Sequence, residues 1–153
     1  MEFRFIDKSF YNELTPQIYR IQSMHSQSRP DLFPEIETMS KKQFKERIKI
    51  KGFIGIAAYI DNSLCGYCFC RIKNFSSKNN PESKSLWIDE FFICDEFRKS
   101  GYGKQLFEKV KEVAKENLCS SIEFEVWDFN ENAQKFYDSL GCKTQKITKE
   151  YIL

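Results

Sequence analysis

The residues of this sequence that are best suited to chemistry form the short run Arg98-Lys99-Ser100-Gly101-Tyr102-Gly103-Lys104. This run follows an apolar segment, 86–93, and precedes a segment with the spacing of an amphipathic helix, 104–117. A helix start exposes backbone N–H groups without intrahelical partners and carries a partial positive charge. Glycine lets that backbone approach a ligand closely, and the basic side chains add full charges. We therefore expect this turn to hold a diphosphate.

The spacing of the glycines argues against two widespread phosphate-binding motifs. A dinucleotide fingerprint would need a third glycine at the position of Leu106. A P-loop would need Ser or Thr after Gly103 and Lys104, and Gln105 follows instead. Two glycines can also serve the geometry of a strand-to-helix turn alone. The turn by itself is therefore equally compatible with a purely structural role and with phosphate binding of a kind that uses neither of these motifs.

Length and charge restrict the class of protein. A chain of 153 residues fits one domain, 1–153, and its 15 Phe supply ample core. The net charge of +2, with both signs interspersed, argues against a dedicated nucleic-acid-binding protein. No apolar run approaches the ~20 residues of a membrane helix. The first residues lack the order of a signal peptide. We expect a cytoplasmic protein with neither nucleic acid nor membrane as partner.

Six cysteines raise the question of a metal site. Cys65 and Cys68 have the spacing of a zinc knuckle, but a structural zinc site would need a second pair of ligands. His25, the one histidine, is far away in the sequence. We therefore expect free thiols in buried strands, no metal, and a reducing compartment.

Apolar periodicity predicts the elements that position these residues. Alternation indicates strands over 2–6, 53–60, 64–73, 85–94 and 121–127, and one or two closing strands over 142–152. Helical spacing indicates helices over 14–26, 40–50, 103–117 and 130–140, with loops over 29–34 and 75–83. Pro16 suits a first helical turn, Ser40 and Asn130 suit N-caps, and Gly141 suits a C-terminal stop. The order β-α-α-β-β-β-α-β-α-β predicts an α/β fold, a mixed sheet with helices on both faces.

A second block of residues gives the turn a specific context. The run 130–141 fits the pattern Asn-x-x-Ala-x-x-Phe/Leu-Tyr-x-x-x-Gly, and 98–103 fits Arg/Gln-x-x-Gly-x-Gly/Ala. Together they resemble the GNAT superfamily of acyl-CoA-dependent N-acyltransferases, which implies a central, mostly antiparallel sheet flanked by helices. The resemblance covers 88–142 well and the rest only in element order. Segments 89–93 and 119–130 look most similar to the diamine (spermidine/spermine) acetyltransferases, although Cys142 stands where an aromatic residue is common.

The resemblance implies acetyl-CoA as co-substrate. The strands 85–94 and 121–127 would separate at their carboxyl ends, and the pantetheine arm would bond to the backbone of Phe91, Phe92 and Ile93. Ligands do favour the carboxyl ends of strands in open α/β sheets. The pyrophosphate would lie on the seven residues of the glycine turn, Arg98, Lys99, Ser100, Gly101, Tyr102, Gly103 and Lys104. Asn130 would cap its helix, contact the cofactor, or both.

The implied reaction is direct attack of an amine on the thioester. An alkylammonium has a pKa of about 10 and must lose a proton before it attacks. Asp89 is the first candidate base, because it matches an acidic strand position of the diamine enzymes. Its neighbour Glu90 should point to the opposite face of the sheet. Glu125 is a third candidate, because some protein N-terminal acetyltransferases carry an acid five residues before the Asn.

The resemblance makes Tyr137 the general acid for the departing thiolate. A backbone N–H near Ile93 or Cys94 would hold the developing oxyanion. Plainer roles exist, since a helical tyrosine often packs in a core and carboxylates are often solvated or ion-paired. A covalent route through Cys94 would need contact with His25, and we rank it below direct attack.

The acceptor is less well defined by the sequence. Asp31, Glu35 and Glu37 could attract a polyamine or another cationic amine, or could form a solvated acidic surface. We expect a small-molecule amine acceptor. The alternatives are a protein N-terminus or lysine as acceptor, and an acyl-CoA-binding module without catalysis. A homodimer is compatible with the resemblance.

Overall fold

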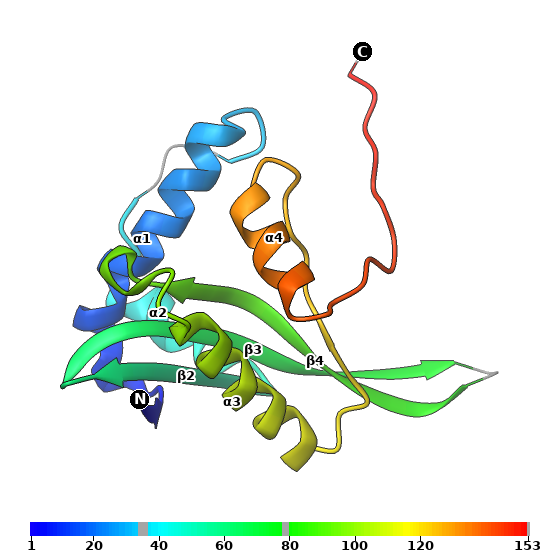
Figure 1. Cartoon of the computed structure of the whole chain (residues 1–153), viewed down its shortest axis with the longest axis horizontal. Helices are drawn as coiled ribbons and strands as arrows, with labels where there is room; N and C mark the ends of the chain where they lie inside the picture. Colours follow the sequence, from blue (N-terminus) through cyan, green and yellow to red (C-terminus); the bar gives the residue numbers. More distant parts are fainter. Residues whose placement is uncertain (34–36, 78–79, 153) are drawn as a thin grey trace.

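The fold is built on one five-stranded sheet. A computed structural model describes residues 1–33, 37–77 and 80–152. The strands lie in the order β1-β2-β3-β4-β5, antiparallel up to β4, with β5 parallel to β4 (Figure 1). Their bounds are β1 Glu2–Phe5, β2 Phe53–Ile60, β3 Ser63–Ser77, β4 Asn80–Ile93 and β5 Ser121–Glu123. The predicted mixed, mostly antiparallel sheet flanked by helices is confirmed.

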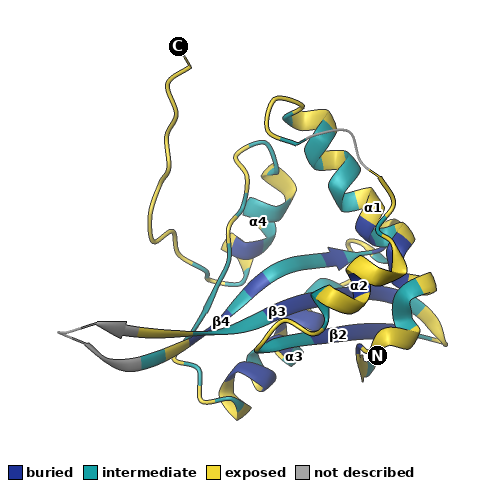
Figure 2. Ribbon diagram, turned by 180° about the vertical axis from the view of Figure 1, so that it is seen from behind, coloured by how far each residue is buried: buried dark blue, intermediate teal, exposed yellow. Residues whose placement is uncertain are grey.

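Helices cover both faces of the sheet, as Figures 1 and 2 show from opposite sides. The helices are α1 Tyr11–Ser28, α2 Lys41–Arg47, α3 Tyr102–Glu116 and α4 Glu131–Ser139, with short 3-10 turns η1 Lys8–Phe10 and η2 Asp95–Phe97. Leu14, Ile18 and Phe44 place α1 and α2 over one apolar cluster. Leu106 and Tyr137 place α3 and α4 over the other. No helix in the described ranges is both long and apolar enough to cross a bilayer.

The two clusters follow from the period of two in the central strands. In β3, Cys68 and Cys70 belong to the α3 cluster, whereas Tyr67 and Phe69 belong to the α1–α2 cluster. All four are fully buried, so β3 has no solvent-facing side in this stretch. A strand buried on both faces positions its neighbours firmly. β3 therefore anchors β4, whose carboxyl half carries the candidate site residues.

Local signals in the sequence set most helix ends correctly. Ser40 and Gln43 form the capping box of α2, and Asn130 accepts a hydrogen bond from the Ala133 N–H at the start of α4 (3.1 Å). Gly141, with φ of 80°, follows α4. The start of α1 was predicted too late. The helix begins at Tyr11, so Pro16 lies inside it and not in its first turn.

Three sequence predictions about strands were wrong. The segment predicted as a loop, 75–83, continues β3 and begins β4 wherever it is described; residues 78–79 of it lie outside the described ranges. The predicted strand 121–127 stops at Glu123. The segment 142–152 forms no strand, and its side chains Ile147, Tyr151 and Ile152 are exposed. Figure 1 shows this segment running beside α4 without joining the sheet. In 121–127 the alternation does report a buried face, because Ile122, Phe124 and Val126 all pack against the α3 cluster, but a buried face does not require backbone pairing beyond Glu123.

Candidate active site

The turn between β4 and α3 has the geometry of a backbone anion site. Lys99 and Gly101 adopt positive φ angles of 60° and 81°. The first N–H that donates back into this helix is that of Gln105, to the Gly101 carbonyl (3.3 Å). Among the hydrogen bonds of the described residues, none is donated by the backbone of 99–104. These N–H groups are therefore available to a ligand at the positive end of a 15-residue helix.

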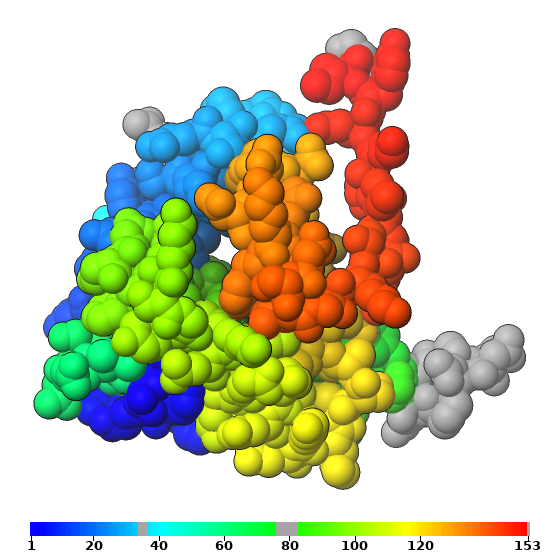
Figure 3. Space-filling model, viewed as in Figure 1, coloured from blue at the N-terminus to red at the C-terminus, as the bar shows by residue number. Residues whose placement is uncertain are grey.

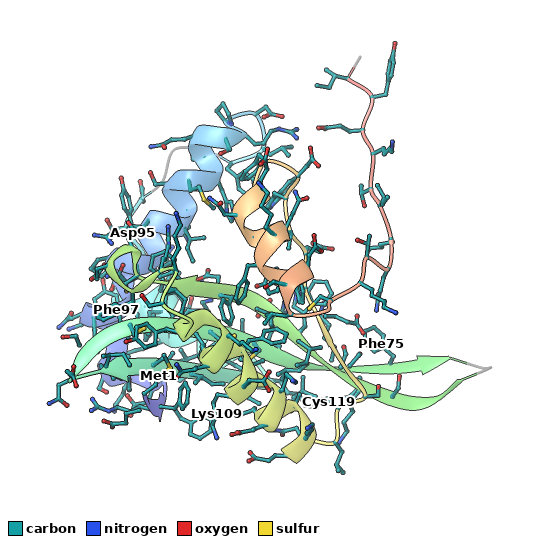
Figure 4. The ribbon with its side chains drawn as sticks, in the orientation of Figure 1. Met1, Phe75, Asp95, Phe97, Lys109 and Cys119 are labelled. Atoms are coloured by element: carbon teal, nitrogen blue, oxygen red, sulfur yellow. The ribbon has the colours of Figure 1, made fainter. Side chains whose placement is uncertain are left out.

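The basic side chains of the turn divide into two roles. Arg98 folds back onto the end of β4, where it donates to the Ile93 carbonyl (2.9 Å) and pairs with Asp95 (2.8 Å). Figure 4 shows Asp95 and Phe97 together in this turn, beside the end of β4. Lys99 and Lys104 are exposed. Arg98 is thus engaged in shaping the turn, whereas Lys99 and Lys104 are the cations that face solvent.

The strands β4 and β5 separate beside this turn. Their parallel pairing covers three positions and ends at Trp87 and Glu123. On its other side, β4 stays paired with β3 as far as Ile93. The backbone edge of 88–93, which includes Phe91 and Phe92, therefore faces a gap on the β5 side. The Cys94 N–H is already bonded to the Cys65 carbonyl (2.8 Å). Because successive N–H groups of a strand point to opposite edges, the Ile93 N–H points to the gap.

Helix α4 faces the turn across the gap. Figure 3 shows the segment after β4 and α4 opposite each other across a crevice. The Phe136 ring of α4 lies so close to Gly103 that a Cβ on Gly103 would be 3.1 Å from it. Phe136 also lies 5.6 Å from the Phe91 ring, between centroids. The absence of a side chain at Gly103 thus lets α3 and α4 approach each other.

Tyr137 lies on the α3 side of the gap. Its ring stacks on Phe124 with a centroid separation of 4.0 Å and lies 6.2 Å from the Phe91 ring. Only 8% of the residue is exposed. Burial raises the pKa of Tyr137 well above the ordinary value of a tyrosine, so the hydroxyl stays protonated at neutral pH. The residue is both a core aromatic and a potential proton donor.

Asp89 and Glu90 lie on the opposite side of the sheet from Tyr137. Arg71 binds Asp89 through two nitrogen atoms, at 2.7 Å and 2.5 Å. Glu90 accepts from the Tyr67 hydroxyl (2.8 Å) and pairs with Arg47 of α2 (2.7 Å). The prediction that the two carboxylates point to opposite faces was wrong. A bulge in β4 leaves Asp89 without a partner residue, because Phe69 opposes Glu90 and Cys70 opposes Ile88. The extra residue turns both carboxylates toward α2.

The structure keeps the other candidate groups apart from this pair. Glu125 is exposed, and its carboxylate lies 4.0 Å from Lys146 of the C-terminal segment. Asn130 uses its side-chain oxygen as a helix cap. Asp31 is bound by Arg29 (2.7 Å), and Glu35 lies outside the described residues.

The covalent alternative through Cys94 finds no support. Cys94 is buried, and burial raises the pKa of its thiol to about 11, so it is not a thiolate at neutral pH. His25 stacks on Phe33 (5.1 Å between centroids) and contacts Phe129 edge-on. No hydrogen bond links His25 with Cys94 in the described part of the chain. All six cysteines are free thiols, four of them buried.

Sequence reasoning missed two arginines of the site. Arg47 ends α2 and Arg71 lies in β3, and both reach the carboxylates of β4. One signal existed for Arg71. It occupies the same alternating face of β3 as Tyr67 and Phe69, so a charge there is enclosed and needs a partner.

The residues present fit a coenzyme A thioester. The turn offers unpaired backbone N–H donors and two exposed lysines for phosphate groups. The free edge of β4 offers backbone groups to the amide-bearing arm, and the Tyr137 ring lies 6.2 Å from the ring of Phe91 in that edge. In the described ranges, no three His, Cys, Asp or Glu side chains are grouped so as to hold a metal ion.

Comparison with known proteins gives matches over most of the chain. The model of the Acetyltransferase (GNAT) family matches residues 16–142. An uncharacterized N-acetyltransferase of Lactobacillus delbrueckii subsp. lactis is 28% identical over 105 residues, which is 69% of this chain and 60% of that protein. A thialysine N-epsilon-acetyltransferase of Bos taurus is 29% identical over 69 residues, 45% of this chain and 41% of that protein. The chain thus spans under two thirds of the length of either relative.

Solved structures match the fold over the whole chain. The BH1408 protein of Bacillus halodurans, solved as a tetramutant, superposes with a TM-score of 0.93 at 24% identity. The match covers 100% of both chains.

Proposed function

The chain belongs to the GNAT family of acetyltransferases, and from that membership we propose that it transfers an acetyl group from acetyl-CoA to a primary amine. The observation that carries this proposal is the separation of β4 from β5 after Trp87. The unpaired N–H groups of the turn and Tyr137 adjoin the freed edge on the α3 side, and Asp89 and Glu90 lie on the α2 side. Cofactor and acceptor can therefore reach one gap from opposite faces of the sheet.

The turn and the β4 edge would hold the cofactor. The N–H groups of 99–104, with Lys99 and Lys104, would bind its diphosphate, and the backbone of Phe91, Phe92 and Ile93 would bind its amide-bearing arm. When bound, acetyl-CoA supplies the thioester, whose carbon–sulfur bond breaks as the nitrogen–carbon bond of the amide forms. The Ile93 N–H points to the gap and is the remaining candidate for an oxyanion donor, because the Cys94 N–H is bonded elsewhere.

The protons would move between the two faces of the sheet. The acceptor arrives as an ammonium and gives a proton to Asp89 or Glu90, directly or through water. Asp89 remains the first candidate because it occupies the bulge nearest the last β4–β5 pair. Tyr137, whose raised pKa keeps it protonated, would give a proton to the departing thiolate. The exposed position of Glu125 favours it least of the three carboxylates.

The acceptor is a small amine in this proposal. A relative named for the ε-nitrogen of thialysine supports a small amine, and the resemblance to diamine enzymes supports a polyamine. A protein N-terminus or lysine is the second candidate, because the GNAT fold is not restricted to one acceptor size. A binding module without catalysis is the third.

One experiment separates these candidates. The purified protein is titrated with CoA in a calorimeter and then incubated with acetyl-CoA and a panel of polyamines, aminoglycosides, amino acids and peptides, with free thiol as the readout. We expect CoA binding and turnover of a small amine. Turnover of peptides alone would favour the second candidate. Binding without turnover of any acceptor would make the chain a binding module, and absence of CoA binding would overturn the proposal.

A further inference from the structure

A charged cavity lies beside Asp89 on the α2 side of the sheet. Its volume is about 360 Å³, and it is lined by Arg47, Ile50, Phe53, Arg71 and Asp89. Figure 2 views this side, where α2 crosses the strands. One wall is β4 with its bulge, the floor is β3, and the far wall is the start of β2 with the turn that follows α2. The cavity therefore extends away from the β4–β5 gap, starting from Asp89.

The charges of this cavity are balanced and tightly paired. Arg71 is matched by Asp89, and Arg47 is matched by Glu90. The Arg47 guanidinium also lies over the Phe69 ring, 4.6 Å from its centroid. All four side chains are at least 65% buried. Two cations and two anions give the cavity no net charge, so a ligand with one positive and one negative end keeps that balance, whereas a ligand with only positive groups does not.

The layout of the cavity fits an acceptor with two different ends. An amine beside Asp89 lies next to the gap where the acetyl group would be transferred. The rest of the acceptor would extend over β3 toward Ile50 and Phe53, whose apolar side chains suit a methylene spacer. On that path it passes Arg47 and Arg71, whose planar guanidinium groups bind carboxylates through paired hydrogen bonds.

We propose that the acceptor carries a carboxylate at the far end of an aliphatic spacer from its reacting amine. This inference rests on the proposed acetyltransferase function and narrows its substrate class. It disfavours an unsubstituted polyamine, because a second ammonium would give this balanced, partly buried cavity an excess of positive charge. Arg47 is the residue proposed to read the carboxylate. Arg71 instead holds Asp89 through two hydrogen bonds and so positions the candidate base.

Three acceptors with the same amine and a similar spacer test the proposal on the unaltered protein. 6-Aminohexanoate ends in an anion, hexylamine in a methyl group, and 1,6-diaminohexane in a cation. We expect kcat/KM to fall in that order, by about tenfold or more from first to last. A kcat/KM for 1,6-diaminohexane that equals or exceeds the value for 6-aminohexanoate would overturn the inference and leave the acetyltransferase function intact.

Binding measured without turnover separates this inference from the function on which it rests. The same compounds are titrated calorimetrically onto the complex with CoA. Selective binding of 6-aminohexanoate supports the inference even if no acceptor is acetylated, an outcome that would overturn the proposed function alone. Failure of 6-aminohexanoate to bind more tightly than 1,6-diaminohexane overturns the inference.

A substitution at Arg47 tests which residue reads the carboxylate. Arg47→Gln removes the cation and leaves Glu90 bonded to Tyr67, so the preference for 6-aminohexanoate over 1,6-diaminohexane should fall about tenfold or reverse. Lys42→Gln removes the same charge from an exposed position of α2 and should leave that ratio unchanged. If Arg47→Gln folds and loses kcat/KM equally for all three acceptors, Arg47 is only structural, and its assignment as the residue that reads the carboxylate is overturned.

Discussion

At the scale of single residues, the decisive feature is one extra amino acid in β4. Asp89 has no partner in β3, and this bulge turns two consecutive carboxylates to the same side of the sheet. Tyr137 lies on the other side, stacked on Phe124. The proposed proton acceptor and the proposed proton donor therefore lie on opposite faces of the sheet. In this arrangement each group can reach a different reactant, the base the incoming amine and the acid the departing thiolate.

Substitution of Tyr137 tests its role as the proton donor. Tyr137→Phe keeps the ring that stacks on Phe124, so CoA affinity should change little while kcat falls about 100-fold. The raised pKa of Tyr137 adds a second expectation. The hydroxyl stays protonated as pH rises through about 10, the ordinary tyrosine value, so the wild-type rate should show no loss from tyrosine ionisation below that pH.

Tyr19→Phe is the matched control, since Tyr19 is an exposed tyrosine of α1. Steady-state rates measured from about pH 7 to about pH 10 are the test. If Tyr137→Phe turns over as fast as the unaltered protein at every pH, Tyr137 is a core residue only.

At the scale of elements, the site depends on two glycines with different physical requirements. Gly101 needs its positive φ of 81°, and a Cβ there would meet open space. Gly103 has no such angle, but a Cβ there would press on the Phe136 ring of α4. One glycine therefore serves the backbone of the turn, and the other serves the contact between α3 and α4.

These requirements predict different consequences for two alanine substitutions. Gly101→Ala should cost about 1 kcal/mol of unfolding free energy through backbone strain. Gly103→Ala should displace α4 and weaken CoA binding about tenfold, and adding Phe136→Leu should restore part of that loss because it removes the clashing ring edge. Denaturant unfolding and calorimetry provide the two readouts. Additive effects of Gly103→Ala and Phe136→Leu on CoA affinity would refute the proposed contact.

At the scale of the whole molecule, the sheet and its two apolar clusters form the body of the protein. The C-terminal segment lies outside this body. Ile147, Tyr151 and Ile152 are 76%, 88% and 79% exposed. Two surface ion pairs connect the segment to the body, from Glu150 to Arg29 and from Lys146 to Glu125. Pairs of this kind contribute about 0–1 kcal/mol each. The stability of the chain should therefore not depend on this segment.

Truncation of the chain after Lys143 tests this expectation. We expect the free energy of unfolding to change by less than about 1 kcal/mol, because the removed side chains are exposed. Denaturant unfolding measures the stability, and sedimentation of both forms measures the homodimer that the family resemblance allows. A loss of several kcal/mol would mean that the segment packs against the body or against a second copy.

The sequence by itself determined the parts of this protein that depend on residues close together along the chain. The strand–glycine turn–helix unit at 98–104, the caps at Ser40 and Asn130, and the motif of α4 were all predicted, because each is set by residues a few positions apart. The placing of helices on both faces of the sheet was also predicted, from the order of the elements along the chain.

Only the tertiary structure decided where the charges of the site point. The partners of Asp89 and Glu90 lie 18 and 43 positions away, in β3 and α2, and the bulge that aligns them depends on the register between two strands. The polar outer parts of β3 and β4 and the bare C-terminal segment were likewise mispredicted. Pairing and register are set by long-range packing, and a one-residue shift in register reverses every side chain of a strand. A linear pattern carries little of that information where no face is buried.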